Sequence, residues 1–224
     1  MSGDLTRNQL FFKDLLSERI QNPQKSNEYS VPFGLNLIDY DLFDEDIQKI
    51  TNLIILTDKF TSLTIRLSET LTDSNTLSKL LRKISLKRQF TSLGFFIKYL
   101  DDSLLNVFLD FIGKLQESVT NLKLMVKYNN KNDESHAVEK ILENLQKNEN
   151  PGLEVLNLTG CNLESPKSLE NLEKILKKSK NLKNIEIKDK PLYKDSFGLN
   201  ISNIKNLKIS NCKLSNISYI PAVF

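Results

Sequence analysis

The side chains that could carry covalent or metal chemistry are few in this chain. It has two cysteines, Cys161 and Cys212, and a single histidine, His136. Thiolates and imidazoles bind zinc, but a structural zinc site needs about four such ligands close together. A nucleophilic triad needs a histidine beside its nucleophile, and His136 has no second histidine or cysteine pair near it in the sequence. We therefore expect His136 to be an exposed helix residue, and we predict no metal, no cofactor and no catalytic residue.

Motifs that bind phosphate or calcium are also missing from the sequence. The seven glycines form neither the G-x-x-x-x-G-K nor the G-x-G-x-x-G spacing. The acidic run Asp39, Asp41, Asp44, Glu45 and Asp46 lacks the glycine and the terminal glutamate of a calcium loop. We interpret this run as a solvated turn and a helix start, where carboxylates favour the helix dipole. Because no acid–base constellation emerges, we expect a protein that is not an enzyme.

The composition is that of an ordinary soluble globular protein, with 39% hydrophobic and 26% charged residues among 224. No apolar run approaches the roughly 18 residues that a transmembrane helix needs, so we expect no membrane insertion. The opening "MSGDLTRNQLFF" lacks a secretory apolar core and a transit-peptide composition. We therefore expect a cytoplasmic protein, either free or associated with the cytoskeleton or an organelle.

The net charge of +3 is unevenly spread along the chain. Residues 1–60 hold ten acidic and six basic side chains, whereas residues 151–224 hold seven acidic and twelve basic ones. This gradient is too mild for a nucleic-acid-binding protein, in which a concentrated basic face would be expected. The excess of lysine over arginine and the two alanines are typical of an AT-rich coding genome.

The elements that position these residues follow from a recurring pattern. In "LEVLNLTGCNL" (153–163) the apolar residues and the cysteine follow neither a strand period nor a helix period throughout. The skeleton recurs in "LKNIEIKDKPL" (182–192) and "IKNLKISNCKL" (204–214), and its first half recurs three times upstream. The second apolar position falls at Leu63, Leu93, Leu122, Leu156, Ile185 and Leu207, in steps of 30, 29, 34, 29 and 22 residues. Such spacing indicates internal repeats.

Helix-like stretches separate the recurring segments. Helical periodicity marks residues 68–84, 101–118, 134–148 and 165–180. We expect a residue of the stretch Asp101-Asp102-Ser103 to cap the second of these, and Ser135 and Ser165 to cap the last two, with Pro166 in the first turn after Ser165. Each unit thus reads as a strand, a turn and a helix, except that the 22-residue step leaves no room for a full helix between residues 187 and 204.

This pattern resembles leucine-rich repeats of the ribonuclease-inhibitor type over residues 60–215. The resemblance implies an α/β solenoid, with a curved parallel sheet on its concave face and helices on its convex face. We assign residues 60–215 to about six repeats, 1–59 to an N-terminal helical cap or degenerate first repeat, and 216–224 to a C-terminal tail or cap. Within 1–59 we expect an amphipathic helix over 1–22, and a later helix leading into a strand near Leu53–Leu56.

The repeat places Cys161 and Cys212 at equivalent positions two units apart. Strands lie about 4.8 Å apart, so the cysteines would be on the order of 10 Å apart. A disulfide needs Cα atoms closer than about 7 Å. We therefore expect buried thiols that contact the backbone of the turn.

The concave face is the candidate binding surface. The partner-contacting residues that we predict there are Arg66, Phe96, Lys98, Lys123, Met125, Asn157, Glu186, Lys188 and Lys208. Most of the lysines could equally be solubilising side chains. Phe96 and Met125 would form an apolar spot of the kind that anchors a partner. A register error of one residue would instead place them inside, because a slip exchanges the two faces.

These observations predict a non-enzymatic protein–protein interaction module, a structural or scaffold subunit of a larger assembly whose partners are other proteins. One alternative is an adaptor or substrate-recognition subunit of a ubiquitin ligase, a use common in the resembled family, although residues 1–59 contain no F-box-like segment. Another is binding of RNA or another polyanion by the C-terminal lysines, a row that Glu154, Glu186 and Asp189 interrupt.

Overall fold

Strands and helices alternate along the chain. The computed structural model describes residues 33–56, 58–128, 131–148, 152–163, 165–188, 192–193, 205–210 and 214–215. The first elements are β1 (Phe33–Leu37), α3 (Asp44–Leu56), β2 (Phe60–Leu67), α4 (Ser74–Leu86), β3 (Ser92–Ile97), α5 (Asp102–Gly113) and β4 (Asn121–Val126). They are followed by α6 (Lys131–Lys147), β5 (Val155–Thr159), α7 (Pro166–Lys178), β6 (Asn184–Lys188), β7 (Leu192–Tyr193), β8 (Asn206–Ser210) and β9 (Leu214–Ser215).

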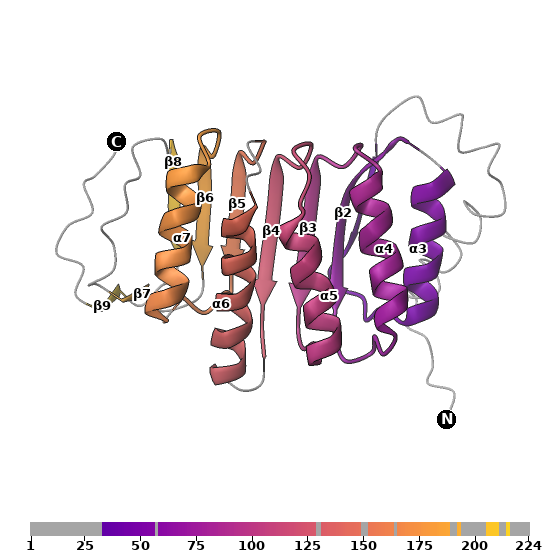
Figure 1. Ribbon diagram of the computed structural model, residues 1–224, viewed down its shortest axis with the longest axis horizontal. Helices are drawn as coiled ribbons and strands as arrows, with labels where there is room; N and C mark the ends of the chain where they lie inside the picture. Colours follow the sequence, from indigo (N-terminus) through magenta and orange to yellow (C-terminus); the bar gives the residue numbers. More distant parts are fainter. Residues whose placement is uncertain are drawn as a thin grey trace.

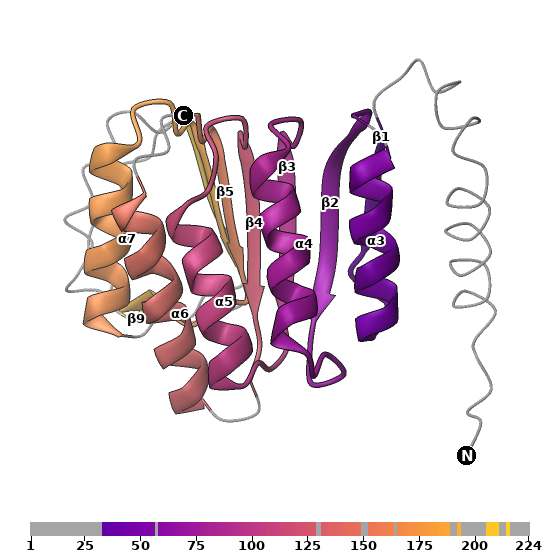
Figure 2. The ribbon, with the colours of Figure 1, turned by 45° about the vertical axis from the view of Figure 1, so that its right-hand side comes forward.

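The main sheet is parallel and follows the order of the sequence. Its seven strands run β1-β2-β3-β4-β5-β6-β8, and each neighbouring pair is parallel. Helices α3 to α7 lie on one face of the sheet, and each packs against the next helix in the chain (Figures 1 and 2). This is a repeat-like α/β fold, in which each strand–helix unit contacts mainly its neighbours. The short strands β7 and β9 pair separately.

The expected ladder of apolar residues is confirmed. Leu63, Leu93, Leu122, Leu156, Ile185 and Leu207 are direct partners from strand to strand. Leu35 on β1 extends the ladder by one further strand. Equivalent positions of successive units therefore stack in register, and the interior between sheet and helices is continuous.

The core between the sheet and the helices combines aliphatic residues with phenylalanines. Phe60 and Phe90 meet edge to face at 5.4 Å between ring centroids. Phe95 lies edge-on against Phe108 at 5.0 Å and Phe111 at 5.7 Å, so that strand β3 is joined to helix α5. Such pairs contribute about 0.5–1.5 kcal/mol beyond the burial of their surface.

Two of the three expected helix caps are confirmed. The carboxylate of Asp101 accepts the backbone N–H of Leu104 at 2.8 Å. The hydroxyl of Ser165 accepts the backbone N–H of Ser168 at 3.4 Å, and Pro166 is the first residue of α7.

The cap expected at Ser135 is wrong. Helix α6 begins at Lys131, so Ser135 lies inside it. The reason lies in Glu134, which is buried and accepts the backbone N–H of Tyr128 at 3.2 Å. This contact ties the first turn of the helix to the segment that follows β4. His136 is exposed on the same helix, as expected.

The strand expected near Leu53–Leu56 is also wrong. These residues form the last turn of α3, whose inward side includes Ile50, Leu53 and Ile54. Ile55 and Leu56 are exposed, so burial here does not alternate as it would in a strand. The edge of the sheet is formed instead by β1, which the sequence patterns did not reveal.

Several expectations fall on residues outside the described ranges. They are the helix over 1–22, the tail 216–224, Cys212 and most of the unit between residues 187 and 204. Cys161 is described: its thiol is buried, as expected, and its Sγ lies 3.5 Å from the carbonyl oxygen of Leu124 on the neighbouring strand β4. None of the described helices is long and apolar enough to span a bilayer.

We expect Phe95→Ala to lower the free energy of unfolding by about 3–5 kcal/mol, because it empties the space between β3 and α5. Urea unfolding followed by circular dichroism measures this change. The matched control is Phe43→Ala: the Phe43 side chain is 53% exposed, and its loss should change stability by less than about 0.5 kcal/mol. Equal effects of the two substitutions would contradict the assignment of the core.

Candidate functional site

The face of the sheet opposite the helices, here termed the open face, displays side chains in rows. Alternate residues of each strand point to opposite faces, and parallel pairing aligns them across strands. One row contains Asn36, Thr64, Gly94, Lys123, Asn157, Glu186 and Lys208. The next contains the side chains of Arg66, Phe96 and Met125 on β2 to β4 and of Thr159 on β5. In the backbone register, Lys188 on β6 and Ser210 on β8 are the partners that follow Thr159. The predicted residues thus lie in two neighbouring rows, apart from Lys98, which follows β3.

Phe96 and Met125 form an apolar pair on the open face. They are direct partners on β3 and β4. Both are half-buried, whereas Phe95 and Leu124, one residue earlier, are buried. The alternation excludes the one-residue slip that would have placed Phe96 and Met125 in the core.

Arg66 is held beside this apolar pair by three contacts. Its guanidinium carbon lies 5.1 Å from the centroid of the Phe96 ring. Nε donates to the carbonyl oxygen of Ile38 at 2.8 Å, and Nη1 donates to the carboxylate of Asp41 at 3.1 Å. The cation therefore stacks on Phe96 in a fixed position, an arrangement that contributes about 0.5–2 kcal/mol.

A glycine sets the shape of the open face beside Lys123. A Cβ atom on Gly94 would lie 2.6 Å from Oγ1 and 2.8 Å from Cγ2 of Thr64. The Thr64 side chain leans over Gly94, which is buried as a result. Lys123 therefore has no neighbouring side chain at the β3 position of its row.

The other part of the open face is a polar network on the last three strands. The amide of Asn157 donates to Oε2 of Glu186 at 2.5 Å. Lys208 approaches Oε1 of the same carboxylate at 3.1 Å. Glu186 is thus bound by both neighbouring strands, although an exposed pair of this kind contributes only about 0–1 kcal/mol.

The remaining predicted lysines differ in their partners. Lys98 pairs with Glu69 at 3.1 Å, and the pKa of Glu69 is lowered by its own backbone N–H and by Lys98. Lys123 is half-buried and has no ion-pair partner within the described part of the chain. Lys188 is placed by its backbone, which pairs with Thr159 and Ser210.

The sequence patterns did not reveal the residues that border this face. Asp41 and Glu69 each follow the strand before that of their partner. Asp41 lies 25 residues before Arg66, and Glu69 lies 29 residues before Lys98. A search for opposite charges about one repeat apart could have found them. The patterns also did not reveal Tyr99, which is 45% exposed and whose ring centroid lies 5.5 Å from that of Tyr128.

The acidic run next to this border does begin a helix, as expected. Helix α3 starts at Asp44. Asp46, however, is buried and accepts the backbone N–H of Phe43 at 3.1 Å, so it caps the helix rather than facing solvent.

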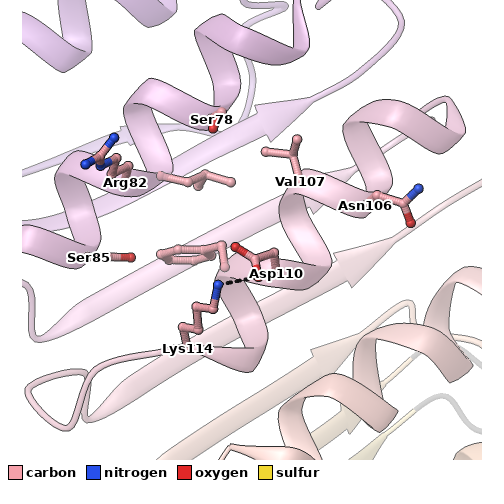
Figure 3. Close-up of a pocket in the computed structure, with 9 residues that line it drawn as sticks. Ser78, Arg82, Ser85, Asn106, Val107, Asp110 and Lys114 are labelled. Carbon is pink, nitrogen blue, oxygen red and sulfur yellow. Dashed lines mark ion pairs between the residues drawn. The ribbon is translucent and has the colours of Figure 1, made fainter.

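A concavity lies on the helical side, between α4 and α5 (Figure 3). It has a volume of about 540 Å³. Leu81, Val107 and Phe111 supply its apolar lining, and the one carboxylate among the lining residues, Asp110, pairs with Lys114 at 2.6 Å. It contains none of the predicted residues and has the character of a gap between two packed helices. Among the described residues, no group of His, Cys, Asp or Glu side chains is arranged to hold a metal ion.

No protein-family model matches this chain, and no curated protein matches it. The function is therefore inferred from the geometry of the open face.

We expect Gly94→Ala to lower the free energy of unfolding by about 1–3 kcal/mol, because the new methyl group overlaps Thr64. Adding Thr64→Ala removes Oγ1 and Cγ2 and should recover most of the loss. The control is Gly113→Ala at the end of α5, where a Cβ would lie 3.7 Å from the nearest atom, and where alanine should stabilise the helix by up to about 1 kcal/mol. Denaturant unfolding of the four proteins measures these changes; destabilisation by both single substitutions alike would contradict the packing at Gly94.

Tyr128 generates a pH prediction. Burial raises its pKa to about 12, and its hydroxyl accepts the backbone N–H of Leu100 at 3.3 Å. The raised pKa means that the folded protein favours the neutral phenol of Tyr128. The contribution of this phenol to the free energy of unfolding is therefore present below the free tyrosine pKa of about 10, and it is lost as pH rises through about 12. Tyrosinate absorbance should show a late-titrating residue that Tyr128→Phe removes. Loss of an earlier-titrating tyrosine in that variant would contradict the assignment.

Proposed function

We propose that this chain is a non-enzymatic leucine-rich repeat protein of the ribonuclease-inhibitor type. The repeat type is supported by the stacked apolar ladder and by contacts between units at a nearly constant offset. Lys87 with Asp58 and Lys98 with Glu69 are each separated by 29 residues. Cys161 occupies the asparagine or cysteine position of the repeat skeleton. Its buried Sγ lies 3.5 Å from a backbone carbonyl oxygen, which also supports the repeat type.

The proposed activity is binding of another protein by the open face, which we take to be the concave face of the solenoid. The observation that carries this proposal is the pair Phe96 and Met125, which the register directs away from the core. Aromatic residues, methionine and arginine are enriched at protein interfaces, and here Arg66 stacks on Phe96. A half-buried apolar pair beside a fixed cation is well suited to anchor a partner.

The mechanism that we propose is display of side chains on a rigid support. Neighbouring strands hold the rows in place, so little conformational entropy is lost when a partner binds. Such a surface suits a structural or scaffold subunit of a multi-subunit assembly. We propose that the assembly is cytoplasmic, either free or attached to the cytoskeleton or an organelle.

The experiment is affinity purification of the full chain from its own cells, followed by mass spectrometry and size analysis. We expect co-purifying proteins that are lost from the double variant Phe96→Ser with Met125→Ser. The matched control is Ile55→Ser with Leu86→Ser, which removes two apolar side chains on the helical side that are 47% and 63% exposed. The control should retain the partners.

Circular dichroism melting of each variant establishes that the fold is kept. Recovery of the wild-type chain as a monomer would count against an assembly subunit. Partners lost from the control but kept by the Phe96 and Met125 variant would move the interaction to the helices.

A further inference from the structure

We propose that the segment bound by the open face is acidic, and that it places an apolar side chain on Phe96 and Met125 while its carboxylates contact Lys123. This inference rests on the proposed function and specifies the chemistry of the partner. It depends on the position of Lys123, on the charged side chains around Lys123, and on the guanidinium of Arg66 that lies over the Phe96 ring.

Lys123 lies in the middle of the open face and has no counter-ion in the described part of the chain. It lies on β4, the central strand of the seven. Its row neighbours are Gly94, which has no side chain, and Asn157, whose amide already donates to Glu186. No anionic partner of Lys123 exists among the residues that the structure describes. An incoming carboxylate can therefore form a charge-assisted hydrogen bond with the Lys123 ammonium group.

The charges of the open face complement an anion. Arg66, Lys98 and Lys208 pair with the carboxylates of Asp41, Glu69 and Glu186 respectively. Asp41 and Glu69 lie beyond the ends of β1 and β2, at the border of the face, whereas Glu186 lies within β6. Lys123 lies between these pairs and has no carboxylate partner among the described residues. A partner with negative charge therefore meets an unpaired positive charge at the centre of the face.

Arg66 adds hydrogen-bond capacity next to the apolar pair. A guanidinium has five N–H donors, and the structure assigns partners to its Nε and Nη1 groups. The side chain remains 20% exposed. The open face therefore offers donors on one side of Phe96 and the Lys123 ammonium beside Met125.

The spacing defines the form of the bound segment. Lys123 and Met125 are two residues apart on one face of β4, which corresponds to about 6–7 Å. A carboxylate and an apolar side chain two residues apart in an extended segment match this distance.

The same features disfavour a single-stranded nucleic acid. A base that stacks on Phe96 would have to compete with the guanidinium of Arg66, which lies over that ring. Tracking a phosphate backbone needs a continuous row of cations, and Glu186 separates Lys123 from Lys208 in the row. An acidic protein segment needs neither.

The test is a selection from a displayed library of random peptides against the immobilised full chain. We expect enriched peptides with net negative charge and at least one large apolar residue. Synthetic copies should bind Lys123→Glu at least about tenfold more weakly, a loss of about 1.4 kcal/mol, and should bind Lys123→Arg nearly as well as the wild type. The matched control is Lys79→Glu, a charge reversal at an exposed position of α4, which should leave affinity within about twofold.

Ionic strength gives a second readout. Binding should weaken several-fold between about 0.05 M and about 0.5 M salt, because screening shortens the reach of exposed charges. Binding that is independent of salt and of Lys123 would overturn the inference.

The outcomes separate this inference from the proposed function. Enriched peptides that are neutral or basic, and that lose binding with Phe96→Ser, would overturn the acidic partner and leave the binding face in place. Peptides insensitive to both Phe96→Ser and Lys123→Glu, or no enrichment at all, would count against both. Binding of polyuridylate that depends on Lys123, with no peptide selected, would overturn the inference in favour of nucleic acid.

Discussion

The in-register stacking of parallel strands is the constraint on which the rest of this structure depends. Each apolar position of one unit lies directly beside its equivalent in the next, from Leu35 through Leu93 to Leu207. Because side chains alternate along a strand, a shift by one residue would exchange the two faces. Burial of Phe95 therefore determines that Phe96 faces outward. The chemistry of the open face follows from the packing of the core behind it.

The energy that maintains this stacking comes mainly from the buried interior. Ion pairs do connect successive units, as between Asp58 and Lys87 or Glu154 and Lys183. Exposed pairs of this kind contribute about 0–1 kcal/mol each. Complete burial of a leucine or phenylalanine contributes about 1.5–3 kcal/mol, and each described unit from β1 to β6 buries several such apolar side chains. The polar contacts between units thus set local geometry, while apolar burial sets stability.

The charged side chains of the open face differ in how firmly their neighbours hold them. Arg66, Lys98 and Glu186 are each engaged by a neighbouring unit, so their positions are largely set before any partner arrives. Lys123 has no such engagement within the described residues and lies beside the apolar pair. The side chains held by their neighbours give the surface a preformed shape, and the unpaired Lys123 gives it a preference for a negatively charged partner. This combination is the physical basis of the proposed binding surface.

The sequence by itself determined the strand–helix alternation, the ladder positions, a cap within Asp101–Ser103 and the cap at Ser165, because these depend on periodicity and on hydrogen bonds within a few residues. It misjudged Leu53–Leu56 because a short apolar run fits a strand or a helix turn equally well. Only the tertiary structure decided that Arg66 pairs with Asp41 and that Gly94 accommodates Thr64. Those contacts join residues about one repeat apart, and the register between strands, rather than any local pattern, brings them together.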